Sequence, residues 1–261
     1  MRLLLRTTRA LTPTEAGRNF YERAKRSIEE AAEAEVAARG AAATLSGRLR
    51  VQATVAVARL HVIPYLPAFF TQHPALDIDL VIDDRNINLV EFGIDIGLRV
   101  GRLGNSMLTA RKIAQCQRLV IGTPSYFNAA GVPRIPADLI RHQVIIYEQP
   151  LGGATWTFRQ GAAETSINLN SRLHLKTTVG VRTCVLADLG LVIASEWMFA
   201  PELNAETVKP VLTDWSLPPV EAWAIFPTGR QASAKARAFA NFIERQMLNP
   251  DRFQQQMGAE N

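Results

Sequence analysis

The side chains that could carry chemistry in this sequence favour binding over catalysis. Metal-ligand spacing is missing among the four histidines, which are His61, His73, His142 and His174. Asp83 and Asp84 follow a predicted strand and could bind a cation, but Arg85 beside them neutralises the pair. The glycine-rich stretch 101–105 fits a turn better than a phosphate cradle. Serine-hydrolase, Walker, dinucleotide and zinc-protease motifs are all missing, so the sequence predicts no enzyme, no metal and no cofactor.

Threonines in front of predicted helices could bind an anion. Thr54 precedes a helix predicted to start near Val57, and Thr177 and Thr178 precede another. Helix N-termini present free N–H groups and favour negative charge, so these ends suit a small carboxylate. Arg99, in a predicted strand, could supply a counter-charge. The alternatives are plain capping for the threonines and a solvated strand residue for Arg99.

Basic charge is concentrated at the N-terminal end of the chain. Residues 1–50 hold ten Lys/Arg against six Asp/Glu, whereas residues 51–261 hold nineteen against eighteen. The side chains near the N-terminus that are good phosphate ligands are Arg6, Thr7, Thr8 and Arg9. A short basic segment before a long helix indicates contact with phosphates. The alternative is a solvated tail.

Composition places the chain among globular proteins. Its 261 residues are 48% apolar and 20% charged, which is enough for two small domains. Cys116 and Cys184 lie far apart in the sequence and indicate neither a disulfide scaffold nor a zinc site. The first residues are too short an apolar run for a signal peptide, and no run reaches membrane-spanning length. A cytoplasmic protein without a membrane partner is predicted.

A long helix is predicted from Thr12 to Arg39. Thr12 or Thr14 could cap it, Pro13 suits its first turn, and Gly40 ends it. Its apolar residues recur at spacings of three and four and include a seam of Phe20, Ala24, Ile28 and Ala31. Such a narrow seam gains little within one chain, so pairing with a second copy is expected. The alternative is packing on its own domain.

Two α/β units are predicted after residue 47. The predicted elements of the first are strands at 48–54, 76–82 and 95–100 and helices at 57–72 and 86–92. This alternation is typical of a mostly parallel sheet with helices on its faces. Residues 108–122 read as a long extended crossing to the second unit, which includes a strand at 167–175 and a helix at 178–189. A cleft lined by strand ends and helix N-termini is expected between the units.

The order of these parts resembles the LysR-type transcriptional regulators. Arg6 to Arg9, Leu11 and Thr14 to Gly17 are similar to the wing and linker-helix entry of that family. The stretches that resemble its effector-binding domain are Gly47–Val51, Pro64–Phe69, His73–Pro74, Asp95–Gly101 and Ala187–Leu191. The likeness covers about residues 3–246.

The resemblance implies an α/β fold in which a two-lobed, periplasmic-binding-protein-like effector domain follows a winged-helix remnant and a long linker helix. The implied divisions are a wing remnant at 1–11, a dimerisation helix at 12–40 and an effector domain at 47–246. Lobe I would cover about 47–118 and 222–246, and lobe II about 119–221. Most of the family's helix-turn-helix is missing from this sequence, so a truncation at the DNA-reading helix is expected.

The resemblance also implies a site and partners. It places the effector in the cleft, in contact with Thr54, Val55, Arg99, Val100, Gly101, Glu148 and Thr178. A small-molecule effector, for which a carboxylate is the candidate, and DNA are the implied partners. A homodimer or homotetramer is implied, with Val57–Phe70 of one copy near Thr178–Leu189 of another. The alternative is a cytoplasmic small-molecule sensor of the same fold that does not bind DNA, and an enzyme in the cleft lacks residues to support it.

Overall fold

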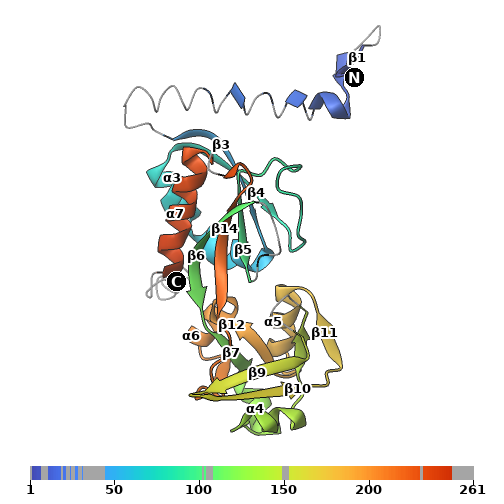
Figure 1. Ribbon diagram of the computed structural model, residues 1–261, viewed down its shortest axis with the longest axis vertical. Coiled ribbons are helices and arrows are strands. Elements are labelled where there is room, and N and C mark those ends of the chain that lie inside the picture. The colour runs from blue at the N-terminus through green and yellow to red at the C-terminus, as the bar shows by residue number, and fades with distance from the viewer. Residues whose placement is uncertain are drawn as a thin grey trace.

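The computed structural model describes residues 2–6, 11–18, 20, 21, 24, 27, 28, 31, 45–101, 103, 108–148, 153–229 and 232–248. Two α/β lobes are stacked along the long axis of the molecule, and the N-terminal hairpin lies at one end (Figure 1). Lobe I is built on a five-stranded sheet and lobe II on a three-stranded sheet. Within the described residues, no helix is both long enough and apolar enough to cross a membrane.

An antiparallel hairpin precedes the long helix. Its strands are β1 (Leu4–Arg6) and β2 (Leu11–Pro13). The helix begins after Thr14, whose hydroxyl accepts a hydrogen bond from the amide of Gly17 at 3.0 Å. Thr14 is therefore the N-cap, and Thr12, the other predicted cap, lies in β2 instead. Further helical residues are described as far as Ala31.

Lobe I contains a mixed sheet in the order β4-β3-β5-β14-β6. Its strands are β3 (Ser46–Ala53), β4 (Ala75–Ile82), β5 (Ile96–Val100), β6 (Thr109–Cys116) and β14 (Val220–Phe226). The first predicted strand is confirmed, and Leu49, Val51 and Ala53 are fully buried on one face, but the strand is not half-buried throughout because Gln52 on the other face is fully buried as well. The prediction of a mostly parallel sheet is wrong in part. β3 is parallel to β4 and β5, but β14 returns from lobe II and pairs antiparallel with both β5 and β6.

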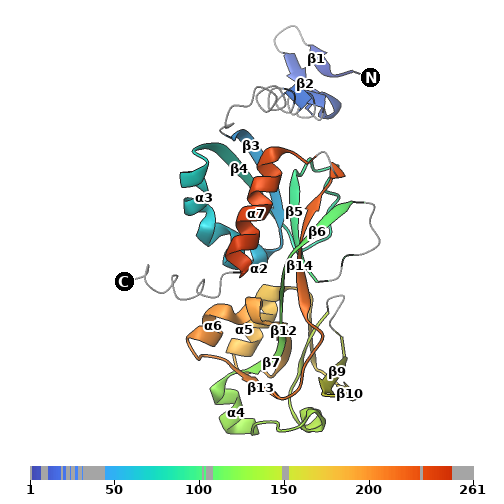
Figure 2. The same ribbon diagram turned by 60° about the vertical axis from the view of Figure 1, so that its left-hand side comes forward.

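Helices cover one face of this sheet (Figure 2). They are α2 (Val55–Val57), the π-helical turn η1 (Ala58–Val62), the 3-10 turn η2 (Ile63–Tyr65), α3 (Leu66–Gln72) and α7 (Ala234–Leu248). The helical stretch predicted over 57–72 is therefore confirmed, with π and 3-10 turns before α3, because Pro64 has no N–H to donate and its ring clashes with the preceding turn. The core beneath these helices centres on Phe69, whose ring lies 5.1 Å from those of Phe239 and Phe242.

The opposite face of the lobe I sheet is covered by loops. A helix was predicted over 86–92, but this segment forms only turns: Asn88 caps one turn through the amides of Val90 (3.2 Å) and Glu91 (3.3 Å), and Gly93, with φ +60°, ends it. A small satellite cluster lies beneath the loops. Its buried members are Leu89, Ile94 and Ile225, and its partly buried members are Val81, Ile87, Leu103, Leu108, Ala110 and Trp223.

Lobe II is built around the antiparallel sheet β12-β7-β13, which has two further strand pairs beside it. Its strands are β7 (Arg118–Gly122), β8 (Ile145–Tyr147), β9 (Thr155–Gln160), β10 (Ala163–Asn168), β11 (Leu173–Leu175), β12 (Val192–Ser195) and β13 (Lys209–Val211). Its helical segments are α4 (Pro124–Ala130), η3 (Pro136–Arg141), α5 (Thr178–Leu186), η4 (Glu196–Phe199) and α6 (Ala200–Asn204). The single strand predicted over 167–175 is wrong, because the hydroxyl of Ser171 bonds the carbonyl of Leu173 and separates β10 from β11.

Two chain crossings join the lobes. The extended stretch predicted over 108–122 is present as β6 and β7, which are separated only by Gln117. The return crossing leads from β13 into β14. One strand of the lobe I sheet is therefore formed by chain that has already passed through lobe II (Figure 1). Contacts between α2 of lobe I and α5 of lobe II also join the lobes. The space between the lobes is therefore bounded by elements of both.

Candidate functional site

A cavity of about 920 Å³ lies between the lobes. From lobe I it is lined by Thr54, Ala56, Val57, His61, Asp84, Asn86, Ile87, Asn88, Leu89, Arg99, Val100, Gly101, Leu103, Leu108, Ala110, Val220 and Ile225. From the other lobe it is lined by Arg118, Tyr147, Thr178, Ile193, Ala194, Ser195, Trp197 and Met198. Its volume is in the range of ligand pockets, and its lining combines an apolar majority with a few polar groups, as is usual for small-molecule sites.

Two helices begin at this cavity beside a threonine that lines it, as predicted. Thr54 precedes α2, but its side chain makes no capping hydrogen bond. At the start of α5 the N-cap is Thr177, whose hydroxyl accepts from the amide of Gly180 at 3.2 Å. The hydroxyl oxygen of the next residue, Thr178, is therefore not needed for the cap. It is buried and has no hydrogen-bond partner among the described residues.

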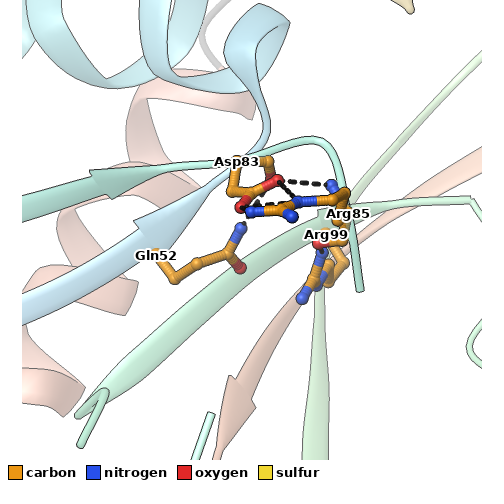
Figure 3. Close-up of polar contacts among 4 residues, drawn as sticks. All are labelled: Gln52, Asp83, Arg85 and Arg99. Carbon is orange, nitrogen blue, oxygen red and sulfur yellow. Dashed lines mark hydrogen bonds and ion pairs between the residues drawn. The ribbon is translucent and has the colours of Figure 1, made fainter. Parts of the chain in front are cut away.

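Arg99 extends from β5 beneath the loop that follows β4 (Figure 3). Its Nη1 donates to the carbonyl oxygen of Arg85 at 3.2 Å, whereas its Nη2 is buried without a partner in the part of the chain that the structure describes. Burial lowers the pKa of the Arg99 guanidinium, and the nearby charge of Asp83 opposes that shift. A buried nitrogen of a partly buried cation is thus unpaired, which is costly unless a ligand satisfies it.

The carboxylate of Asp83 is paired with Arg85 and not with Arg99 (Figure 3). Arg85 Nε lies 3.1 Å from both carboxylate oxygens, and its Nη2 lies 2.8 Å from Oδ2. Hydrogen bonds from the side chain and backbone of Arg85 lower the pKa of Asp83 to about 2, so this carboxylate is ionised at neutral pH. The fully buried Gln52 holds the same turn, because its Nε2 donates to the Asp83 carbonyl at 3.0 Å. The predicted neutralisation of this acid by Arg85 is therefore confirmed.

Arg118 is a second cation in the cavity wall that sequence reasoning missed. It opens β7, opposite Ser195 of β12 in the strand register. Burial lowers the pKa of its guanidinium. No carboxylate of the described residues lies within ion-pair distance of Arg99 or Arg118. The one carboxylate in the lining is that of Asp84, which accepts from the amide of Val55 at 2.9 Å.

Aromatic side chains from both lobes form another part of the wall. His61, only 3% exposed, lies edge-on to Trp197 with ring centroids 6.1 Å apart. Tyr147 ends β8 and also faces the cavity. No local pattern marked these residues, because they lie on three segments that only the folded chain brings together.

The predicted contact residues divide into two groups. Thr54, Arg99, Val100, Gly101 and Thr178 line the cavity, whereas Val55 and Glu148 do not. The amide of Val55 is bonded to Asp84. Glu148 points away from the cavity, toward His174 Nδ1 at 3.4 Å and Lys176 Nζ at 3.6 Å. Successive residues of an extended chain face opposite sides, so Tyr147 occupies the position in the wall that was predicted for Glu148.

The residues predicted to contact DNA are not described in full. Thr7, Thr8, Arg9 and the side chain of Arg6 lie outside the described residues. In the predicted dimer seam, Phe20 is 54% exposed and Ile28 71% exposed, and Ala31 is exposed as well. Ala24 is half-buried. At the described positions of the linker seam, the apolar side chains are therefore largely uncovered within a single chain.

Comparison with known proteins identifies the family. Residues 42–248 match the model of the LysR substrate binding domain. The chain is 30% identical over 246 residues to an HTH-type transcriptional regulator of Xanthomonas campestris pv. campestris, covering 93% of this chain and 72% of that protein. It is 30% identical over 241 residues to the HTH-type transcriptional regulator PtxR of Pseudomonas aeruginosa, covering 92% and 77%.

Solved structures agree with this assignment. The LysR-type regulator CrgA of Neisseria meningitidis superposes with a TM-score of 0.71 at 26% identity, covering 95% of this chain and 85% of that one. The regulatory domain of CrgA alone superposes with a TM-score of 0.69 and shares the two-lobed α/β fold. The resemblance predicted from the sequence motifs is confirmed, and the chain belongs to the LysR-type transcriptional regulators.

Proposed function

We propose that this transcriptional regulator senses a small carboxylate bound in the cavity between its lobes. One observation carries the proposal. Arg99 Nη2 and Thr178 Oγ1 are both buried without a partner among the described residues, and they line the same cavity from opposite lobes. A carboxylate has two acceptor oxygens and one negative charge, so it could accept from both groups at once. Ligand binding would then join the lobes, which is how occupancy could alter their relative position.

Binding, not catalysis, is the role that this site supports. The relatives are regulators of transcription, and their names refer to a helix-turn-helix. We infer that the partner of the N-terminal part is DNA and that the protein acts in the cytoplasm, where DNA is accessible. A sensor of the same fold without DNA binding is the alternative, and a gel-shift titration with and without the ligand separates the two.

Removing the hydroxyl of Thr178 tests the site directly. We expect Thr178→Val to weaken binding of an acid by tenfold or more, because a hydrogen bond to a charged group contributes about 1.5–3 kcal/mol. The same loss is expected for Thr54→Val. Isothermal titration calorimetry with an acid selected by a thermal-shift screen of monocarboxylates measures both. Thr183→Val is the matched control, because its hydroxyl bonds the carbonyl of Val179 on the outer side of α5. If both site variants fold and bind as tightly as the parent protein, the carboxylate is bound elsewhere.

We also propose that the chain forms a homodimer or homotetramer through two surfaces. The linker seam supplies the first. The second joins the segment 57–70 of one copy to the segment 178–189 of another, since each carries exposed apolar side chains. Their exposed members are Ile63, Phe70, Val179, Leu186 and Leu189.

Replacing Ile28 by aspartate should weaken the linker pairing. The substitution puts a charge into an apolar seam, so the dissociation constant of that pairing should rise by about tenfold or more. Sedimentation velocity across a micromolar concentration series measures the change. Arg18→Asp introduces the same side chain at an exposed position that lies two residues before Phe20 and faces away from the seam, and it should leave assembly intact. A protein that sediments as a monomer before any substitution would contradict both interfaces.

A further inference from the structure

We propose that the ligand is an amphipathic monocarboxylic acid whose apolar part fills a side chamber of the cavity in lobe I. This inference rests on the proposed carboxylate site and names the chemistry of the remainder of the ligand. The chamber is the part of the cavity bordered by Ile87, Leu89, Leu103, Leu108, Ala110 and Ile225. All six side chains are apolar and all belong to the satellite cluster.

The chamber and the carboxylate site lie on the same face of one sheet. In the strand register, Ile225 of β14 is paired with Gly97 of β5 on one side and with Ala110 of β6 on the other. Arg99 is two residues beyond Gly97 on β5, and side chains two apart in a strand point to the same face. That face is opposite to the one covered by α7, where Leu98 and Ala224 are buried. Arg99 therefore stands at the rim of the apolar chamber.

The absence of a side chain at residue 97 keeps the satellite cluster close to the sheet. A Cβ at Gly97 would lie 2.8 Å from Cδ1 of Leu89, which is too close for carbon atoms. Leu89 consequently packs against the strand backbone, and the loop that carries it forms the outer wall of the chamber. This wall offers an apolar ligand contacts with carbon atoms on both sides, which favours a hydrophobic tail.

The charges in the lining set the number of acidic groups that the ligand should carry. Among the described residues, the charged groups of the wall are the guanidinium groups of Arg99 and Arg118 and the carboxylate of Asp84. One positive charge is in excess, and one carboxylate would balance it. A second carboxylate, at the far end of the ligand, would have to enter the apolar chamber, where an unpaired charge is strongly unfavourable. The lining thus favours a monoacid over a diacid.

A series of straight-chain acids tests the inference on the unmodified chain. The probes are monocarboxylates from butanoate to decanoate and the α,ω-dicarboxylates of the same lengths, each titrated by calorimetry. We expect affinity for the monoacids to rise about fourfold for each added methylene until the chamber is full. Each diacid should bind more than about thirtyfold more weakly than the monoacid of equal length.

Filling the chamber should shorten the preferred chain. Ala110→Leu adds apolar volume at the chamber wall, so long acids should lose affinity while butanoate binds as it does to the parent protein. Ala129→Leu, at an exposed position of α4, is the matched control and should change neither. Affinity that does not depend on chain length, or diacids that bind as tightly as monoacids, would overturn the chamber while leaving the carboxylate site. Absence of binding by every acid would instead reject the carboxylate site and the inference with it.

Discussion

Replacing Glu202 by alanine should lower the free energy of unfolding by about 3–5 kcal/mol, because it leaves the buried guanidinium of Arg182 without its carboxylate partner. The side chains of Arg182 and Glu202 are only 14% and 13% exposed and form an ion pair between α5 and α6. Burial lowers the pKa of Arg182, and the charge of Glu202 opposes that shift. Without Glu202 the burial cost would remain. Urea denaturation followed by circular dichroism measures the loss.

An exposed ion pair in the same lobe provides the control. Arg159 and Glu164 lie 2.6 Å apart on the β9–β10 hairpin, with side chains 64% and 51% exposed. Glu164→Ala should cost less than about 1 kcal/mol of unfolding free energy, because both charges of this pair are solvated in the folded protein. The double variant Arg182→Met with Glu202→Leu removes both buried charges and should recover most of the stability lost by Glu202→Ala. Equal losses for Glu202→Ala and Glu164→Ala would contradict this account.

The same ion pair supports the wall of the cavity. Arg182 donates through Nη1 to the carbonyl of Met198, and its guanidinium carbon lies 5.5 Å from the ring centroid of Phe199. Met198 lines the cavity. Glu202 holds the Arg182 side chain in place, and Arg182 anchors the η4 segment that positions Met198. Loss of Glu202 should therefore weaken ligand binding as well as lower stability.

The first strand of lobe I was easier to predict from the sequence than the loop that follows β4. The alternation that ends in Ala53 identified β3 because Leu49, Val51 and Ala53 are fully buried on one face, while the residues between them, Arg50 and Gln52, are polar. The helical stretch predicted over 57–72 is present, but its change from α to π and 3-10 hydrogen bonding around Pro64 could not be predicted from apolar spacing. The helix predicted over 86–92 is reduced to a single turn, which Asn88 caps through the amides of Val90 and Glu91 and which ends at Gly93, a residue with positive φ. Apolar spacing alone does not show where such a turn ends.

The wall residues at strand ends and helix starts were predicted from the sequence. The wall residues that only the folded chain brings together from distant segments were missed. Thr54 and Thr178 were found because a threonine before a helix is a local signal. Arg118 was missed because an arginine at a strand start has no such signal, and only the pairing of β7 with β12 places it in the wall. Glu148 was predicted in place of Tyr147 because a choice between neighbouring residues depends on which side of the chain faces the cavity.

Replacing Phe239 by alanine should cost about 3–5 kcal/mol of unfolding free energy, since the ring is fully buried and its removal leaves a cavity in the core of lobe I. The ring packs edge-to-face against Phe69, with centroids 5.1 Å apart and planes at 88°. An aromatic pair of this geometry contributes more than its buried area alone. Circular dichroism during urea denaturation measures the loss.

Two further substitutions make the Phe239 test specific. Phe239→Leu keeps most of the apolar volume and should lose clearly less stability than Phe239→Ala, whereas Phe92→Ala should be almost neutral because that ring is 48% exposed. A loss below about 1 kcal/mol for Phe239→Ala would show that the site collapses around the missing ring. Phe239 belongs to α7, the last helix of lobe I, and Phe69 belongs to α3, near the start of the same lobe. The pair therefore connects the two separate parts of the chain that form lobe I, and its loss should loosen the lobe that carries Arg99 and the apolar chamber.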